Sequence, residues 1–183
     1  MTLIRYGNTM NQSGFSKTET LIIVALIIVF TGISVINLTI VKKRARFDGQ
    51  LKDMHSDLLN YRNLSMLQKK RTAVWIGPNE YIFKSYSSLG ENIANPASGT
   101  VVESRQLVHE IRKFKSGKSS IFDINTDRIE FDGRGLSYNL PNNRLEIIIW
   151  PVNLNNRENC LVVYPMRSSM GNMADATRCK PSE

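Results

Sequence analysis

Residues 14–20 read Gly14-Phe15-Ser16-Lys17-Thr18-Glu19-Thr20, and the apolar run LIIVALIIVF follows at residues 21–30. No charged residue occurs between Leu21 and Val41, and this stretch would be about 31 Å long as a helix. That length is enough to span a bilayer, so the stretch predicts a transmembrane helix. One carboxylate, Glu19, stands at its start. Because an ionised side chain is costly in lipid, Glu19 requires a partner and is a candidate functional residue.

The helical pattern continues beyond the uncharged stretch. Apolar residues recur at spacings of three and four, which predicts one apolar stripe on an amphipathic helix. These residues are Phe47, Leu51, Met54, Leu58, Tyr61 and Leu64. The helix is expected to run from about residue 19 to residue 70 and to end near Lys69-Lys70-Arg71, where cations suit the negative end of the helix dipole.

After Arg71 the periodicity changes from helical to alternating. Residues 72–76 and 81–86 flank Gly77-Pro78-Asn79-Glu80 and predict a β-hairpin, while residues 87–99 predict a loop. Residues 101–114 fit strand alternation moderately well. Further strands are expected at residues 120–125 and 128–131, on either side of an Asn-Thr-Asp turn, and at 136–140, 145–150 and 160–164. The tail, 167–183, has no periodicity and is expected to be a loose loop unless Cys179 ties it to Cys160.

Composition and motifs argue against catalysis. The sequence has no nucleophile elbow, no phosphate-binding glycine loop and no Cys-x-x-Cys pair, and its two cysteines and two histidines have no metal-ligand spacing. We therefore predict a non-enzymatic protein with no cofactor and no metal. The formal net charge of +8 is compatible with nucleic-acid or anionic-membrane contact without establishing either.

The N-terminal signature resembles that of type IV prepilins and type II secretion pseudopilins. Gly14, Phe15, Ser16 and Glu19, with the apolar run behind them, match the family pattern, and Lys17 departs from it. The resemblance implies that prepilin peptidase/N-methyltransferase cleaves after Gly14 and methylates the new terminal amine of Phe15. It also implies that Glu19 pairs with that amine on a neighbouring subunit. The leader would begin at Met1 or at Met10.

The order of elements, with the phrase Ile129-Glu130-Phe131-Asp132-Gly133-Arg134-Gly135, resembles the H-type (GspH/FimT/FimU-like) minor pseudopilins. The expected fold class is α+β and pilin-like. A long N-terminal helix, half transmembrane and half amphipathic, would pack on a C-terminal antiparallel β-sheet domain. The expected segments are a leader (1–14), a transmembrane/assembly helix (15–41), an amphipathic helix (42–71) and a β-rich periplasmic domain with a C-terminal loop (72–183).

The resemblance also implies a location. The chain would be a single-pass protein of the bacterial inner membrane, in contact with its lipid, with its C-terminal domain in the periplasm, and would then enter a periplasmic or surface filament. The cations at residues 42–46 favour a cytoplasmic C-terminal domain by the positive-inside rule, but we give the specific motif more weight. In an oxidising compartment, Cys160 and Cys179 predict one disulfide, the alternative being two free buried thiols.

The expected function is therefore that of a structural minor pilin or pseudopilin, whose partners are other such subunits of a type II secretion pseudopilus or a type IV pilus. One alternative is a DNA-binding minor pilin for DNA uptake. Its candidate contacts are Arg105, Arg112, Lys113, Lys115, Lys118, Arg178 and Lys180, although a solvated basic face explains the same residues. A plain membrane-anchored periplasmic protein is the other alternative.

Overall fold

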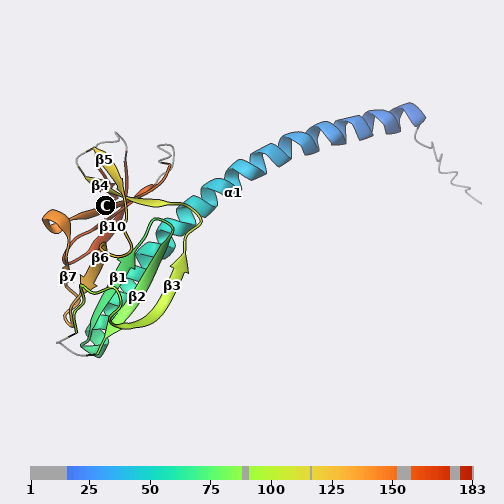
Figure 1. The fold of residues 1–183 in the computed structure, drawn as a ribbon. Helices are drawn as coiled ribbons and strands as arrows, with labels where there is room; N and C mark the ends of the chain where they lie inside the picture. Colours follow the sequence, from blue (N-terminus) through green and yellow to red (C-terminus); the bar gives the residue numbers. More distant parts are fainter. Residues whose placement is uncertain (1–15, 88–90, 116, 152–157, 174–177, 183) are drawn as a thin grey trace, which may run out of the picture. The chain divides into compact units, whose positions relative to one another are not determined.

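The computed structural model describes residues 16–87, 91–115, 117–151, 158–173 and 178–182. The predicted leader, with Gly14 and Phe15 at its end, lies outside these residues. The chain divides into two compact units, residues 1–42 and 43–183, which are described separately below. Helix α1 (Lys17–Gln68) contributes to both units, and its course can be followed in Figure 1.

The first part of α1 does not have the transmembrane character that its lack of charge suggested. Within the described ranges, no helix combines the length and the apolarity that crossing a membrane requires. The predicted single-pass inner-membrane anchor over residues 15–41 is therefore wrong. The continuous apolar run, residues 21–30, amounts to about 15 Å of helix, whereas a bilayer core is about 30 Å thick.

The second part of α1 supplies one side of the core. Of the predicted stripe, Phe47, Leu51, Met54, Leu58 and Tyr61 are buried, and Leu64 packs partly buried against them. The predicted apolar face is confirmed. The helix ends because Lys69 adopts a left-handed backbone conformation (φ 50°), and the Lys70 N–H then donates to the carbonyl of Ser65. This pair of features is a Schellman-type stop, which reverses the chain into the first strand.

Two antiparallel sheets follow α1, where one had been predicted. The five-stranded sheet has the order β3-β2-β1-β6-β7. Its strands are β1 (Arg71–Ile76), β2 (Glu80–Tyr86), β3 (Thr100–Gln106), β6 (Arg128–Phe131) and β7 (Ser137–Tyr138). The six-stranded sheet has the order β11-β10-β9-β8-β4-β5. Its strands are β4 (Ile111–Lys115), β5 (Lys118–Ile121), β8 (Leu145–Ile149), β9 (Cys160–Val163), β10 (Ser168–Asn172) and β11 (Lys180–Pro181). A short 3-10 turn, η1 (Pro141–Asn143), precedes β8.

The expected fold class is therefore wrong in its transmembrane half and in its single sheet. The hairpin of β1 and β2 is confirmed. The strands predicted on either side of the Asn-Thr-Asp turn do not pair: β5 pairs with β4 in one sheet, whereas β6 pairs with β1 in the other. Local alternation predicts that a strand exists, but the pairing partner is decided by long-range packing.

Burial on both faces explains the second sheet. All residues of β8 and β9 are buried. Ile147 and Leu161 join the core under α1, whereas Ile148 and Val162 belong to a separate cluster on the opposite face. A sheet covered on only one side would have left half of these positions exposed. The core under α1 contains residues of both sheets, so the second part of α1 packs across the pair.

The tail is tied down by the disulfide, and it forms the strands β10 and β11 where a loop had been expected. Cys160 and Cys179 form the predicted disulfide, with Cα atoms 6.0 Å apart, and both residues are buried. Arg144 donates to the carbonyl of Cys179, and the Cys179 N–H donates to the carboxylate of Glu146. Gly171 permits β11 to lie beside β10, because a Cβ there would collide with the carbonyl oxygen of Lys180. The periodicity of the sequence could not show these long-range bonds.

Candidate functional site

The N-terminus of α1 carries the residue that was singled out for subunit assembly. The backbone N–H of Ser16 donates to Oε2 of Glu19 at 3.0 Å, and the Thr20 N–H donates to the Ser16 carbonyl at 3.1 Å. Ser16 is thus the N-cap, and Glu19, three residues on, reaches back to it as in a capping box. The spacing Ser-x-x-Glu is a capping signal that the sequence already carries. Gly14 and Phe15, the predicted processing residues, lie outside the described residues.

The first turns of α1 expose an apolar surface on every side. Successive residues of a helix are about 100° apart, so an unbroken apolar run of ten residues covers its whole circumference. Ile28 is 67% exposed and Leu21 is 72% exposed. The other exposed residues of the run are Ile22, Ile23, Val24, Leu26, Ile27, Val29 and Phe30. A helix that is apolar on all faces is normally surrounded by other apolar groups, so this surface is a candidate interface.

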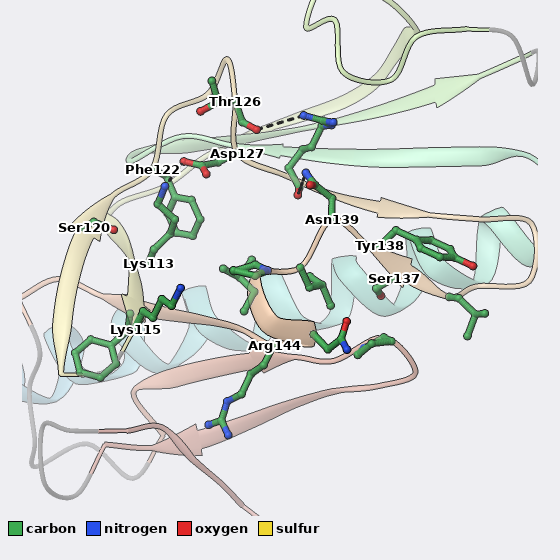
Figure 2. A pocket seen from close by; sticks show the side chains of 18 residues that line it. Lys113, Lys115, Ser120, Phe122, Thr126, Asp127, Ser137, Tyr138, Asn139 and Arg144 are labelled. Carbon is green, nitrogen blue, oxygen red and sulfur yellow. Dashed lines mark hydrogen bonds and ion pairs between the residues drawn. The ribbon is translucent and has the colours of Figure 1, made fainter.

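The second unit contains a cavity of about 660 Å³ between its two sheets. In Figure 2, Lys113 and Phe122 line the left part of the cavity, and Asn139 and Arg144 line its right part. Apolar residues of β4, β8, η1 and the neighbouring turns line much of it: Phe114, Leu136, Leu140, Pro141 and Leu145. A volume of this size is within the range of small-molecule sites.

The cations around this cavity are largely neutralised by carboxylates of the chain itself. The amine of Lys113 lies 2.6 Å from Asp127 and also faces the ring of Phe122. Arg128 pairs with Glu130 at 2.8 Å, and Arg144 pairs with Glu146 at the same distance. The cavity therefore offers shape and apolar surface but little net charge to select a ligand.

A second pocket, of about 400 Å³, shares Phe114, Lys115, Pro141 and Arg144 with the first and adds Asn142, Arg178 and Glu146, whose carboxylate is paired with Arg144. It brings together two of the predicted nucleic-acid contacts from distant parts of the sequence. Lys115 ends β4, and Arg178 immediately precedes the buried Cys179, whose disulfide holds this part of the chain beside β9. Both side chains are exposed.

The other predicted contacts are spread over both sheets. Arg112 pairs with Glu110 at 2.7 Å and lies over the ring of Trp150, 4.2 Å from its centroid. Arg105 belongs to β3 of the other sheet. Lys118 is exposed and faces Lys115 across the β4–β5 pair, and Lys180 is exposed on β11. Of the seven proposed contacts, only Lys113, Lys115 and Arg178 line the two joined pockets.

A polar network joins α1 to the outer strand of the five-stranded sheet. Tyr61 of α1 donates to Glu103 at 2.9 Å, and Tyr81 of β2 donates to Asp57 of α1 at 2.8 Å. Arg105 lies 2.6 Å from Glu103 and 3.6 Å from Asp57. Burial, and then the hydrogen bond to a carboxylate, raise the pKa of each tyrosine far above its ordinary value, so both hydroxyls remain donors at neutral pH. The network holds β3 against the helix.

Among the described residues, no group of three or more His, Cys, Asp or Glu side chains is arranged to hold a metal ion. Comparison with known proteins adds no assignment, because no family model, curated protein or solved structure matches the chain. The candidate sites are thus the start of α1 with its apolar surface and the pocket shared by Lys115 and Arg178.

Proposed function

We propose that this chain is a structural minor pilin or pseudopilin, which assembles into a type IV pilus or a type II secretion pseudopilus through the first turns of α1. The observation that carries the proposal is the apolar surface around residues 21–30, exposed on every side and preceded by one carboxylate. Helices of neighbouring subunits are the partners proposed for this surface. Burial of apolar area would drive their association at roughly 25 cal/mol per Å².

Glu19 has two roles in this proposal. Its Oε2 atom already accepts the Ser16 N–H, which stabilises the first turn of the helix. An ionised carboxylate has about four acceptor positions, so the same group retains capacity for an ammonium group. We propose that the methylated amine of Phe15 on an adjoining subunit, released by cleavage after Gly14, occupies that capacity. A charge buried among apolar helices is tolerated when it is paired.

The two roles of Glu19 can be separated by a matched pair of variants. Glu19→Gln keeps an oxygen that accepts the Ser16 N–H but has no charge, whereas Glu19→Ala loses both. Filaments are sheared from cells of the native organism and probed for this chain. Loss of the chain from filaments in both variants, with normal amounts in the cell, supports the ammonium pairing. Normal incorporation of Glu19→Gln contradicts it and leaves Glu19 as a helix cap only.

The processing step has an independent test. Mass spectrometry of the mature N-terminus is expected to find N-methylated Phe15. A chain purified from the native organism that still begins at Met1 or Met10 would contradict the proposal, whatever the behaviour of Glu19.

DNA binding is a second candidate function, and the pocket shared by Lys115 and Arg178 favours it. Two exposed cations from distant segments line one pocket, and a phosphate group is the complementary ligand. Binding of the full chain to duplex DNA should then weaken steeply with salt. Replacing both residues by alanine should reduce the slope of log K against log salt by about 1.8, because each neutralised phosphate contributes about 0.9 to that slope. Arg112→Ala is the matched control, because Arg112 is engaged with Glu110 elsewhere. An unchanged slope in the double variant would exclude this site.

A further inference from the structure

The outer strand of the five-stranded sheet, β3, has features of a pairing surface. It stands at the end of the strand order and has no strand on its outer side among the described residues. Every residue of β3 except Glu103 is exposed, including Val101 (55%) and Val102 (50%). An edge strand of this length presents unpaired backbone donors and acceptors to a strand of another chain.

The register with β2 shows which backbone groups of β3 face outward. The Leu107 N–H donates to the carbonyl of Asn79 at 2.7 Å, and the register continues from there with Tyr81 opposite Arg105 and Ile82 opposite Ser104. Hydrogen-bonded and non-hydrogen-bonded pairs alternate along an antiparallel ladder. The residues at positions 105 and 103 therefore use their backbone groups toward β2, and Ser104 and Gln106 direct theirs away from it.

The side chains beside Ser104 are complementary to their own copy. Glu103 and Arg105 lie on the same face, since both belong to the network with α1. If two copies of β3 pair antiparallel with Ser104 opposite Ser104, each Glu103 faces an Arg105 of the other copy. A pair centred on Glu103 would instead place two carboxylates together, and one centred on Arg105 two cations. Like charges directly opposite each other destabilise a strand pair.

We propose that two copies of this chain pair through β3, antiparallel and centred on Ser104, to form a continuous sheet across a two-fold axis. Ser104 and its copy exchange both backbone hydrogen bonds. Glu103 and Arg105 of the two copies form a cluster of alternating charge on the helix side. β3 has a bulge at Val102, which has no partner in the register with β2, so the regular pairing of the two copies is centred on residues 103–105. Because a two-fold contact closes on itself, this dimer is a form of the free subunit and is distinct from the contacts along a filament.

Cysteine cross-linking of the full chain tests the register. The native cysteines are buried in their disulfide, so a new surface thiol is the only one exposed among the described residues. Ser104→Cys should form a disulfide-linked dimer under mild oxidation, since Cα atoms of a hydrogen-bonded pair are about 5.5 Å apart and disulfides require less than about 7 Å. Gln106→Cys is the matched control on the same strand. In the proposed register, the Cα atoms of residue 106 in the two copies would be roughly 13 Å apart along the strand, so no disulfide-linked dimer should form.

The outcomes are distinct. A dimer with Ser104→Cys and none with Gln106→Cys supports the pairing, provided that a maleimide labels both thiols equally. Equal cross-linking of both variants would show random collision and overturn the proposal, as would no cross-linking of either. Adding Gln106→Pro to Ser104→Cys removes an outward N–H without breaking the ladder to β2, so the dimer band should be lost. A band that persists in that double variant would overturn backbone pairing.

Discussion

Opening the disulfide between Cys160 and Cys179 should lower the free energy of unfolding of the second unit by about 3 kcal/mol. The bond joins two residues with a sequence separation of 19. For a loop of this length, the loss of chain entropy in the unfolded state is worth about 3 kcal/mol. The native structure should change little on reduction. The hydrogen bonds of Cys179 to Arg144 and Glu146 do not require the sulfur atoms. The loss should therefore come from the greater freedom of the unfolded chain.

Urea denaturation followed by tryptophan fluorescence measures this effect. Trp75 is 1% exposed and Trp150 is 37% exposed, and both belong to the second unit. For a slope of about 1–3 kcal/mol per molar urea, a loss of about 3 kcal/mol lowers the midpoint by roughly 1–3 M. The comparison is made between oxidised and reduced protein, with a thiol count to show that the bond has opened.

A double Cys160→Ala and Cys179→Ala variant provides the control. Its midpoint should be low and insensitive to reductant, because the cross-link is already absent. An unchanged midpoint with an unchanged slope on reduction of the wild-type chain would refute the entropic reasoning. A reduced slope with a normal midpoint would show instead that β10 and β11 detach locally before the rest of the unit unfolds.

Three further predictions concern the second unit. Leu51→Ala should lower the free energy of unfolding by about 2–5 kcal/mol, because Leu51 is 1% exposed in the core under α1. Urea denaturation measures this loss, and a value below about 1 kcal/mol would contradict that packing. Gln50→Leu should lower the free energy of unfolding by about 1–3 kcal/mol in the same assay, because the Gln50 amide both donates to the His109 carbonyl and accepts from the His109 N–H. An unchanged free energy of unfolding would show that water replaces both bonds. Burial alone would raise the pKa of Asp132, but hydrogen bonds, beginning with that from the Leu136 N–H, lower it on balance below its ordinary value of 3.8. Its contribution to stability is therefore present above about pH 4 and lost as the pH falls through the lower folded pKa. Asp132→Asn should flatten the stability profile below pH 4, and an unchanged profile would contradict the assignment.

Local patterns predicted the elements that depend on near neighbours. The apolar stripe from Phe47 to Tyr61 faces the core because residues three and four apart share one side of a helix. The hairpin of β1 and β2 was visible because both alternating runs and their turn are contiguous. The pairing of the two cysteines followed because only one pairing exists in the chain.

The same reasoning failed where a pattern has two physical meanings. An uncharged stretch was interpreted as a membrane span, but no helix of the described ranges combines the length and the apolarity that crossing a membrane requires. The basic segment left nucleic-acid contact and a solvated basic face open, and the fold adds that Arg105, Arg112 and Lys113 each meet a carboxylate. The carboxylate of Asp127 reaches Lys113 from the turn after β5, a contact that spacing along the sequence does not show.

The sequence by itself determined the apolar run at residues 21–30, the helix cap formed by Ser16 and Glu19, and the existence of most strands, because these depend on residues close together in the chain. The tertiary structure alone decided that the strands form two sheets, that the tail joins the second sheet, and that β3 is left at an open edge. These features depend on which distant surfaces bury each other. A strand with both faces buried, such as β8, satisfies its local pattern equally well in either sheet, and only packing against α1 and the disulfide cluster determines its place.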